Sequence, residues 1–460
     1  MSEHTSQAHP AGDHALTRRS LLTAAAGGAA LLATHGLPAW ARPVARAASL
    51  RQPGSLPFPG RAEGTPSMPQ IEHIVVLMME NHSFDNLLGM VPHQVPGRAS
   101  VDGLTLRRGK PVNANPDAAG NPVVARHMSS PCQLSGEPSQ SWNASHQAYD
   151  NGLNDGFVRA SAPVAMSFWD QRDIPFTYSL VEHFPIGERY FCSVLGQTFP
   201  NRCYLFSGTS SGTINDTIAD APPPNGTIWD RLDAHGIDWG IYYEPPSYPS
   251  FELVPGSVTP ARASRVHPFS RFLSDTAAGK LKQFTFLDPN YETTSQENPQ
   301  DIQLGERYIA QVVRSLMAAR TWKHTALFIT YDEHGGYYDH VPPPAALAPD
   351  SIAPLLTPKD VPGAFDRYGF RVPLIVVSPW ARARYVSRVT QDHTSIAAFI
   401  ERKWNLPAMT FRDANAQPMT DYFDFRKPAF LTPPKLAKAP ALGPGLAKCQ
   451  AAGLNPPLTL

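Results

Sequence analysis

Four polar residues in the sequence stand where two apolar runs end. Glu80 and Asn81 follow one run, and Asp332 and Glu333 follow another. Such runs are typical of buried parallel strands, and ligands of a parallel sheet bind just beyond the carboxyl ends of its strands. Two acidic clusters at one sheet edge repel each other unless a cation lies between them. The alternative interpretation is that each cluster caps a helix or faces solvent. The oxygen ligands predict one hard divalent ion, with calcium first and manganese, magnesium, iron or zinc as alternatives.

Thr198 is the candidate nucleophile. It stands two residues before Pro200, and proline is common in the first turn of a helix, while Gly208 is a typical helix end. A hydroxyl at the N-terminus of a helix faces free backbone N–H groups and the positive end of the helix dipole, which together suit a phosphate. Bound to a cation, this hydroxyl would lose its proton more easily and become a nucleophile. A threonine that only caps the helix is the alternative interpretation.

The elements that must position these residues alternate between strand and helix. Short apolar runs predict buried parallel strands at 74–79, 326–330 and 372–377, with weaker candidates at 239–243 and 284–287. Apolar residues at helical spacing predict helices over 302–317 and 396–404, the second with Asp392 or Thr394 as its N-cap. This alternation predicts an α/β fold with a mainly parallel central sheet that is flanked by helices.

Residues 1–47 are predicted to form an export signal. Arg18 and Arg19 precede the apolar run 21–33, which is too short to span a bilayer, and A-x-A cleavage sites follow it. These features resemble a twin-arginine signal, so we expect the Tat export machinery as a partner and a periplasmic or secreted location. A chance basic pair before an N-terminal helix is the alternative.

The rest of the chain divides by composition into a Pro/Gly/Ser-rich linker at 48–69, a catalytic domain at 70–430 and a Pro-rich tail at 431–460. The 460 residues include 39 basic and 39 acidic side chains, so no net charge attracts nucleic acid, and we expect no such partner. Four cysteines allow three disulfide pairings if all are oxidised: Cys132, Cys192, Cys203 and Cys449.

Five sequence blocks between residues 70 and 405 resemble, in the same order, those of the bacterial phosphoesterase family. The blocks lie at 71–89, 146–157, 198–210, 332–343 and 392–395. This family holds phosphatidylcholine-type phospholipases C and acid phosphatases, and its core resembles that of alkaline phosphatases and sulfatases. The resemblance implies that one metal ion is bound by Glu80, Asn81, Thr198, Asp332 and Glu333.

The same resemblance implies that Thr198 attacks phosphorus and forms a phospho-enzyme, which water then hydrolyses. His146 and His340 become catalytic candidates, His146 for contacting the phosphoryl oxygens or protonating the leaving alcohol, although each could be a hydrogen-bonded structural histidine. The substrate-binding candidates are Asn201, Arg202, Asn298 and His393. Asn298 stands where the family often has the histidine of Glu-His-Pro, so it can donate a hydrogen bond but cannot act as an acid.

The resemblance implies a phospholipid or small phosphate-ester substrate. We expect a phospholipase C acting on phosphatidylcholine-type lipids, with transient contact to a membrane surface, and an acid phosphatase acting on monoesters as the alternative. The aromatic loop 242–248 could hold a choline cation or be an ordinary surface loop. Two other classes remain: a hydrolase using Ser210 of a G-x-S-x-G pattern, and a non-catalytic binding protein of the same fold.

Overall fold

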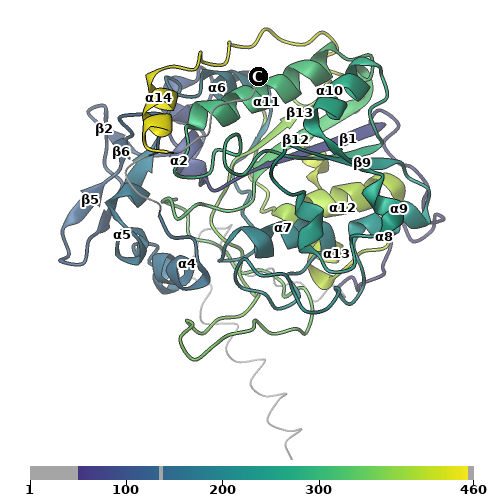
Figure 1. Cartoon of the computed structure of the whole chain (residues 1–460), viewed down its shortest axis with the longest axis horizontal. Coiled ribbons are helices and arrows are strands. Elements are labelled where there is room, and N and C mark those ends of the chain that lie inside the picture. Colours follow the sequence, from purple (N-terminus) through teal and green to yellow (C-terminus); the bar gives the residue numbers. More distant parts are fainter. Residues whose placement is uncertain (1–49, 134–137, 454–460) are drawn as a thin grey trace, which may run out of the picture. The chain divides into compact units, whose positions relative to one another are not determined.

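A central sheet of eight strands has the order β10-β9-β11-β1-β12-β13-β8-β14 (Figure 1). Its strands are β1 (His73–Met79), β8 (Ile186–Gly187), β9 (Trp239–Tyr243), β10 (Val266–Pro268), β11 (Phe284–Asp288), β12 (Thr325–Tyr331), β13 (Leu374–Val377) and β14 (Val386–Ser387). The five strands from β10 to β12 are parallel, and the apolar side chains of β11, β1 and β12 are buried on both faces. The α/β prediction with a mainly parallel sheet is therefore confirmed.

One detail of that prediction, the direction of strand β13, is wrong. This strand runs antiparallel to both β12 and β8, although its apolar run indicated a parallel strand. The fully described segment 332–373 between β12 and β13 contains no helix. Parallel neighbours need a crossover that carries the chain back to the starting edge, so a chain that stays at the carboxyl edge re-enters the sheet in the opposite direction.

Helices cover both faces of the sheet (Figure 1). One face carries α6 (Pro175–His183), α10 (Phe269–Ala277) and α11 (Ile302–Ala318), and the other carries α7 (Thr198–Ser207), α8 (Ile228–Ala234), α12 (His393–Trp404) and α13 (Phe411–Asn415). The two predicted helices are thus confirmed as α11 and α12. Asp392, one of the two candidate caps, is the N-cap of α12 and forms a capping box with Ser395.

Short elements fill the connection from β1 to α7. They are α2 (Phe84–Leu88), α3 (Val91–Gln94), α4 (Trp142–Tyr149), α5 (Phe157–Ala160) and the strand pairs β2 (Leu106–Arg107) with β3 (Lys110–Pro111), β4 (Ala114–Pro116) with β5 (Pro122–Val124), and β6 (Arg126–His127) with β7 (Ser167–Phe168). Two further helices are α9 (Pro260–Ala263) and α14 (Pro444–Ala451).

The computed structural model describes residues 50–133 and 138–453. The predicted signal at 1–47 lies outside these residues and stays a prediction. Segment 50–69 is hydrogen-bonded to the end of α12 and beyond, for example from the Gly54 amide to the Ala408 carbonyl. The C-terminal tail crosses α11, where Arg314 donates to the Ala437 carbonyl, and a disulfide joins Cys449 to Cys132. Among the described helices, none is long and apolar enough to cross a membrane.

Candidate active site

The three predicted segments meet at the carboxyl edge of the parallel strands. The backbone N–H of Asn81, just after β1, donates to Oδ1 of Asp332, just after β12, over 3.1 Å. The Thr198 hydroxyl, at the start of α7, lies 3.4 Å from Oδ1 of Asn81. Gly335 permits this approach, because a Cβ at that position would lie 1.9 Å from the Asn81 carbonyl oxygen. Neighbouring strand ends and a helix N-terminus therefore converge on one point.

Thr198 is the first residue of α7, and Gln197 is the residue that precedes the helix. Gly208 ends this helix in the left-handed conformation at φ 73°, as predicted. Asn201 holds the turn in front of Thr198: its Oδ1 accepts the N–H groups of Ser193 and Val194 at 2.8 and 3.0 Å. The Asn201 side chain is fully buried in these contacts. These contacts position the turn before Thr198, and the expected role of Asn201 in binding substrate stays a prediction.

Arg202 is buried among three carboxylates, and its expected role in binding substrate stays a prediction. Its side chain has no exposed surface and donates to Glu80 at 3.0 Å, to Asp288 at 3.1 Å and to Asp332 at 3.0 Å. Position 202 lies one helical turn beyond Thr198, so its side chain points back into the site from beneath it. A buried cation paired with three carboxylates fixes the geometry of the strand ends around Thr198.

The acidic groups outnumber this one arginine. Burial raises the pKa of Glu80 well above its usual range, and the nearby Glu297 raises it further, against the opposing charge of Arg202. Burial and the charge of Asp332 likewise raise the pKa of Glu333. One Glu333 oxygen accepts the Gly335 N–H at 2.8 Å, and the other is buried without a hydrogen-bond partner among the described residues. Both features fit a bound cation, since buried charge needs compensation.

Glu297 belongs to the same cluster and was missed by the sequence analysis. Its Oε1 accepts a hydrogen bond from the Asn81 side chain at 3.1 Å. The segment Glu297-Asn298-Pro299, which resembles the Glu-His-Pro of the family, was the signal that could have indicated Glu297. The Asn298 side-chain oxygen accepts the hydroxyl of Tyr337 at 2.6 Å, and this side chain is mostly buried. The segment 297–299 therefore lies beside the acidic side chains, and the hydrogen bond from Tyr337 holds Asn298 in place.

His393 is hydrogen-bonded to the protein through both ring nitrogens. One ring nitrogen pairs with the Tyr190 hydroxyl at 2.8 Å and the other with the backbone carbonyl of Asp332 at 2.7 Å. Burial lowers the pKa of His393 to about 4, so the ring is neutral at neutral pH. With both nitrogens occupied, His393 holds the backbone that carries Asp332. Its expected role in substrate binding stays a prediction.

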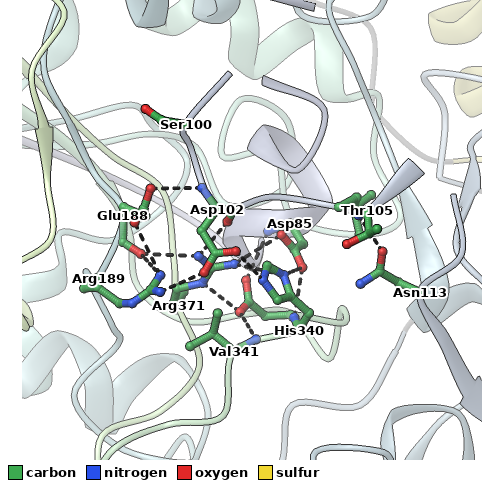
Figure 2. Close-up of polar contacts among 12 residues, drawn as sticks. Asp85, Ser100, Asp102, Thr105, Asn113, Glu188, Arg189, His340, Val341 and Arg371 are labelled. Carbon is green, nitrogen blue, oxygen red and sulfur yellow. Dashed lines mark hydrogen bonds and ion pairs between the residues drawn. The ribbon is translucent and has the colours of Figure 1, made fainter. Parts of the chain in front are cut away.

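His340 belongs to a separate charged cluster, shown in Figure 2. Its ring nitrogens contact Asp85 at 2.6 Å and Asp102 at 2.9 Å, while Arg371 pairs with Asp85 at 3.2 Å. Burial lowers the pKa of His340, but the charge of Asp85 and the hydrogen bonds to both carboxylates outweigh burial and raise it to about 10. Both ring nitrogens of His340 are therefore held by carboxylates. The expected catalytic role of His340 stays a prediction.

Within residues 50–133 and 138–453, two groups of acidic and histidine side chains have three ligand atoms close enough together to hold a metal ion. They are Asp85 with Asp339 and His340, and His127 with Asp170 and Asp173. Each group already has an arginine, because Arg371 pairs with Asp339 at 2.8 Å and Arg172 pairs with Asp170 at 2.8 Å. The cluster beside Thr198 differs from them because a buried carboxylate oxygen there lacks a partner among the described residues.

His146 lies on α4 and lines an open depression of about 800 Å³. Its ring packs on Trp142, with centroids 4.0 Å apart, and its Nδ1–H donates to the Trp142 carbonyl at 2.8 Å. The same depression is lined by Leu195, three residues before Thr198, and by Arg367. Nδ1 is thus used for structure, and Nε2 is the nitrogen that could contact a ligand in the depression.

The Ser210 pattern lacks the geometry of a serine hydrolase. Ser210 follows helix α7 and precedes an irregular segment up to α8, whereas a nucleophile elbow needs a strand before the serine and a helix directly after it.

Comparisons with known proteins agree with the sequence blocks. The model of the Phosphoesterase family matches residues 71–407. Non-specific phospholipase C1 of Arabidopsis thaliana is 31% identical over 387 residues, which cover 77% of this chain and 71% of that protein. Phospholipase C A of Mycobacterium tuberculosis (strain ATCC 25618 / H37Rv) is 30% identical over 486 residues, which cover 94% and 90%. Non-hemolytic phospholipase C of Pseudomonas aeruginosa is 27% identical and covers 90% of this chain and 64% of that protein.

Solved structures with related folds have much lower sequence identity. A protein in the alkaline phosphatase superfamily from Vibrio parahaemolyticus matches with a TM-score of 0.40 at 8% identity, over 82% of this chain and 76% of that one. Murine ectonucleotide pyrophosphatase/phosphodiesterase 5 matches with a TM-score of 0.33 at 12% identity, over 55% and 95%.

Proposed function

Because the chain belongs to the phosphoesterase family and is a phosphoric ester hydrolase, we propose that it is a phospholipase C with Thr198 as nucleophile. The single observation that carries this proposal is the contact of the Thr198 hydroxyl with Asn81, 3.4 Å away, beside buried acids with uncompensated charge. The names of the relatives, all phospholipases C, support a phospholipid substrate. The expected lipids are of the phosphatidylcholine type.

In the proposed reaction, the Thr198 oxygen forms a bond to phosphorus and the bond from phosphorus to the glycerol oxygen breaks. The threonine hydroxyl gives up its proton, and the departing glycerol oxygen takes one up, so diacylglycerol leaves as an alcohol. Water then cleaves the bond between Thr198 and phosphorus and releases the phosphorylated headgroup. The positive end of the α7 dipole favours negative charge at Thr198 throughout.

The oxygen donors around Thr198 fit a divalent cation. Such an ion would supply positive charge that lowers the pKa of the nucleophile and neutralises the phosphate. Arg202 keeps two of the acids in place from the opposite side, through its contacts with Glu80 and Asp332. The proposed ligands are Glu80, Asn81, Thr198, Asp332 and Glu333, with calcium as the first candidate.

The experiment compares Thr198→Ala and Thr198→Ser with the wild type on phosphatidylcholine and on p-nitrophenyl phosphate. We expect Thr198→Ala to lose at least about 10³-fold in kcat, because no other hydroxyl can replace the nucleophile, and Thr198→Ser to keep part of the activity. Thr217→Ala, at an exposed threonine, is the matched control. Full activity of Thr198→Ala would contradict the mechanism.

The wild-type results separate the other functions. Hydrolysis of the monoester alone would favour an acid phosphatase, and hydrolysis of neither substrate would favour a binding protein.

We also propose export through the twin-arginine route. Besides the Arg18-Arg19 pair, the disulfide between Cys132 and Cys449 supports this proposal, because disulfides persist in oxidising compartments outside the cytosol. Replacing both arginines with lysine should keep the protein in the cytosol, as measured by fractionation. Unchanged export of that variant would contradict the proposal.

A further inference from the structure

We propose that Phe199, Tyr248 and Asp216 form a subsite beside Thr198 that binds a quaternary ammonium headgroup. This inference rests on the proposed phospholipase C function and names the part of the substrate that the chain selects. In the proposed reaction the headgroup stays bonded to phosphorus when diacylglycerol leaves. A headgroup subsite must therefore lie next to the nucleophile and stay filled through both steps.

The aromatic wall comes from two loops and a helix. Phe199 is the residue after Thr198 in α7, and its ring packs edge-on against Tyr248, with centroids 6.3 Å apart. Tyr248, in the loop after β9, packs against Tyr291, with centroids 5.2 Å apart. Tyr248 is 41% exposed, so part of its ring is open to a ligand. Tyr242, at the start of the aromatic loop 242–248, does not belong to the wall, since it is buried in the core with its hydroxyl bound to Asp275.

This wall is held rigidly before any ligand arrives. The backbone N–H of Tyr291 donates to the Ser247 hydroxyl at 2.8 Å, and the Asn290 side chain donates to the Pro245 carbonyl at 3.1 Å. Tyr291 is covered by the Arg202 guanidinium, 5.2 Å from its ring centre. Tyr291 is therefore the fixed back of the wall, and Tyr248 and Phe199 provide the open surface. A preorganised surface binds more tightly because little ordering is needed.

The charges around the wall favour a cation. Asp216 accepts the Phe199 backbone N–H at 2.8 Å and the Gln197 side chain at 2.6 Å, so its carboxylate lies at the start of α7. Burial and the negative charges of Glu80 and Asp216, against the opposing charge of Arg202, raise the pKa of the Tyr248 hydroxyl to about 12. An apolar ligand such as an acyl chain gains nothing from these carboxylates. A cation is attracted both by them and by the ring faces.

The hydrogen bonds already made favour a cation without N–H groups. Each Asp216 oxygen accepts one bond from the protein, which leaves less capacity for a primary ammonium that must replace its water contacts. A quaternary ammonium needs no acceptor and is weakly hydrated, so aromatic rings and a nearby negative charge suffice to bind it. The chemistry of the subsite thus matches a choline-type headgroup better than an ethanolamine-type or an anionic one.

The test compares two p-nitrophenyl phosphodiesters that differ in one atom. One carries choline, and the other carries the 3,3-dimethylbutyl group, in which carbon replaces the charged nitrogen. We expect wild-type kcat/KM to be about 10-fold higher for the choline ester, in line with cation–π energies. In Tyr248→Leu and in Phe199→Leu this ratio should fall about fivefold. The ratio is independent of the fraction of enzyme that is folded, so a poorly folded variant still gives an answer.

Two matched variants complete the test. Tyr248→Phe keeps the ring and should keep the ratio, and Tyr385→Leu, next to β14 at the far end of the sheet from β9, should also keep it. Equal cleavage of both esters by the wild type, or an unchanged ratio in Tyr248→Leu, overturns the subsite while leaving the proposed function intact. Cleavage of neither ester by the wild type overturns the proposed function itself.

Discussion

Nε of Arg202 lies 3.0 Å from Oδ2 of Asp332, and neither side chain is exposed to solvent. The pair joins helix α7, which carries Thr198, to the end of strand β12. The same guanidinium reaches Glu80 after β1 and Asp288 at the end of β11. Three neighbouring parallel strands are therefore tied to helix α7 by one buried cation. This relationship explains how residues far apart in the sequence keep a common geometry.

Replacing Arg202 with methionine should destabilise the fold strongly. The substitution keeps the volume but leaves three buried carboxylates without their cation, and breaking a buried pair in this way costs about 3–5 kcal/mol. Urea unfolding at neutral pH measures the loss. Arg172→Met is the control, because Arg172 pairs with Asp170 but its side chain is 69% exposed, so little stability should be lost. Similar small losses in both variants would contradict a central role for Arg202.

Removing the metal should lower both activity and thermal stability. A ligand that binds only the folded state at about 100 times its Kd adds about 2.7 kcal/mol to the free energy of unfolding. We expect a chelator to lower Tm and calcium to restore it in the wild type. Glu333→Gln should lose this calcium-dependent shift, because the amide cannot replace the buried carboxylate.

Glu306→Gln is the matched control for Glu333→Gln. Glu306 is also a buried glutamate, but it lies on α11 and binds the Thr177 amide at 2.8 Å. Its calcium response should equal that of the wild type. A calcium shift that persists in Glu333→Gln would remove this residue from the proposed ligands.

Much of the fold follows from local pattern. The strands β1 and β12 are visible in the sequence as continuous apolar runs, because both of their faces are buried. The helices α11 and α12 are visible as apolar stripes at helical spacing, because the face towards the sheet is buried. The direction of β13 leaves no such trace, since buried parallel and antiparallel strands share one pattern. Its direction depends on the connection 332–373, whose path is set by contacts with distant segments.

The candidate site was predictable in its position and less so in the roles of its residues. Strand ends and a helix start supply Glu80, Asp332 and Thr198, and general rules place such ends together. Arg202 near a nucleophile suggests a phosphate ligand, yet its partners come from three other parts of the chain. His340 likewise binds Asp85 and Asp102, which only the folded structure brings to it. Roles that depend on long-range partners cannot be inferred from neighbouring residues.

The disulfide between Cys132 and Cys449 should stabilise the fold and the site. It closes a loop of 317 residues, and native disulfides typically contribute about 2–4 kcal/mol. The neighbouring Gln133 side chain donates to the Glu297 carbonyl at 3.1 Å, next to the acid cluster. The double variant Cys132→Ser/Cys449→Ser should therefore show lower Tm and lower activity.

A reducing agent provides the control for the disulfide prediction. It should lower the Tm of the wild type to that of the double variant and leave the variant unchanged, because the two remaining cysteines, Cys192 and Cys203, are free thiols. Equal Tm values for the oxidised wild type and the double variant would show that the bond adds no stability.

His340 should make the stability of the protein fall at alkaline pH. Its pKa is raised from 6.5 to about 10 in the folded state, where the ring lies between Asp85 and Asp102 and beside Arg371. A raised pKa means that the folded state holds the proton more tightly than the unfolded state does. The resulting stability is fully present below about pH 6.5 and is lost as the pH rises towards 10, by an amount on the order of 5 kcal/mol.

The measurement is the free energy of unfolding at several pH values between 6 and 10. His340→Gln should be less stable than the wild type at pH 6 and should show a flatter pH dependence, because the amide keeps hydrogen bonding but cannot carry the charge. His324→Gln is the control, since His324 is half-buried and lies 3.7 Å from the exposed Glu72. Its pH dependence should follow that of the wild type. If His340→Gln shows the wild-type slope, the proton bound between Asp85 and Asp102 is not the source of the alkaline loss.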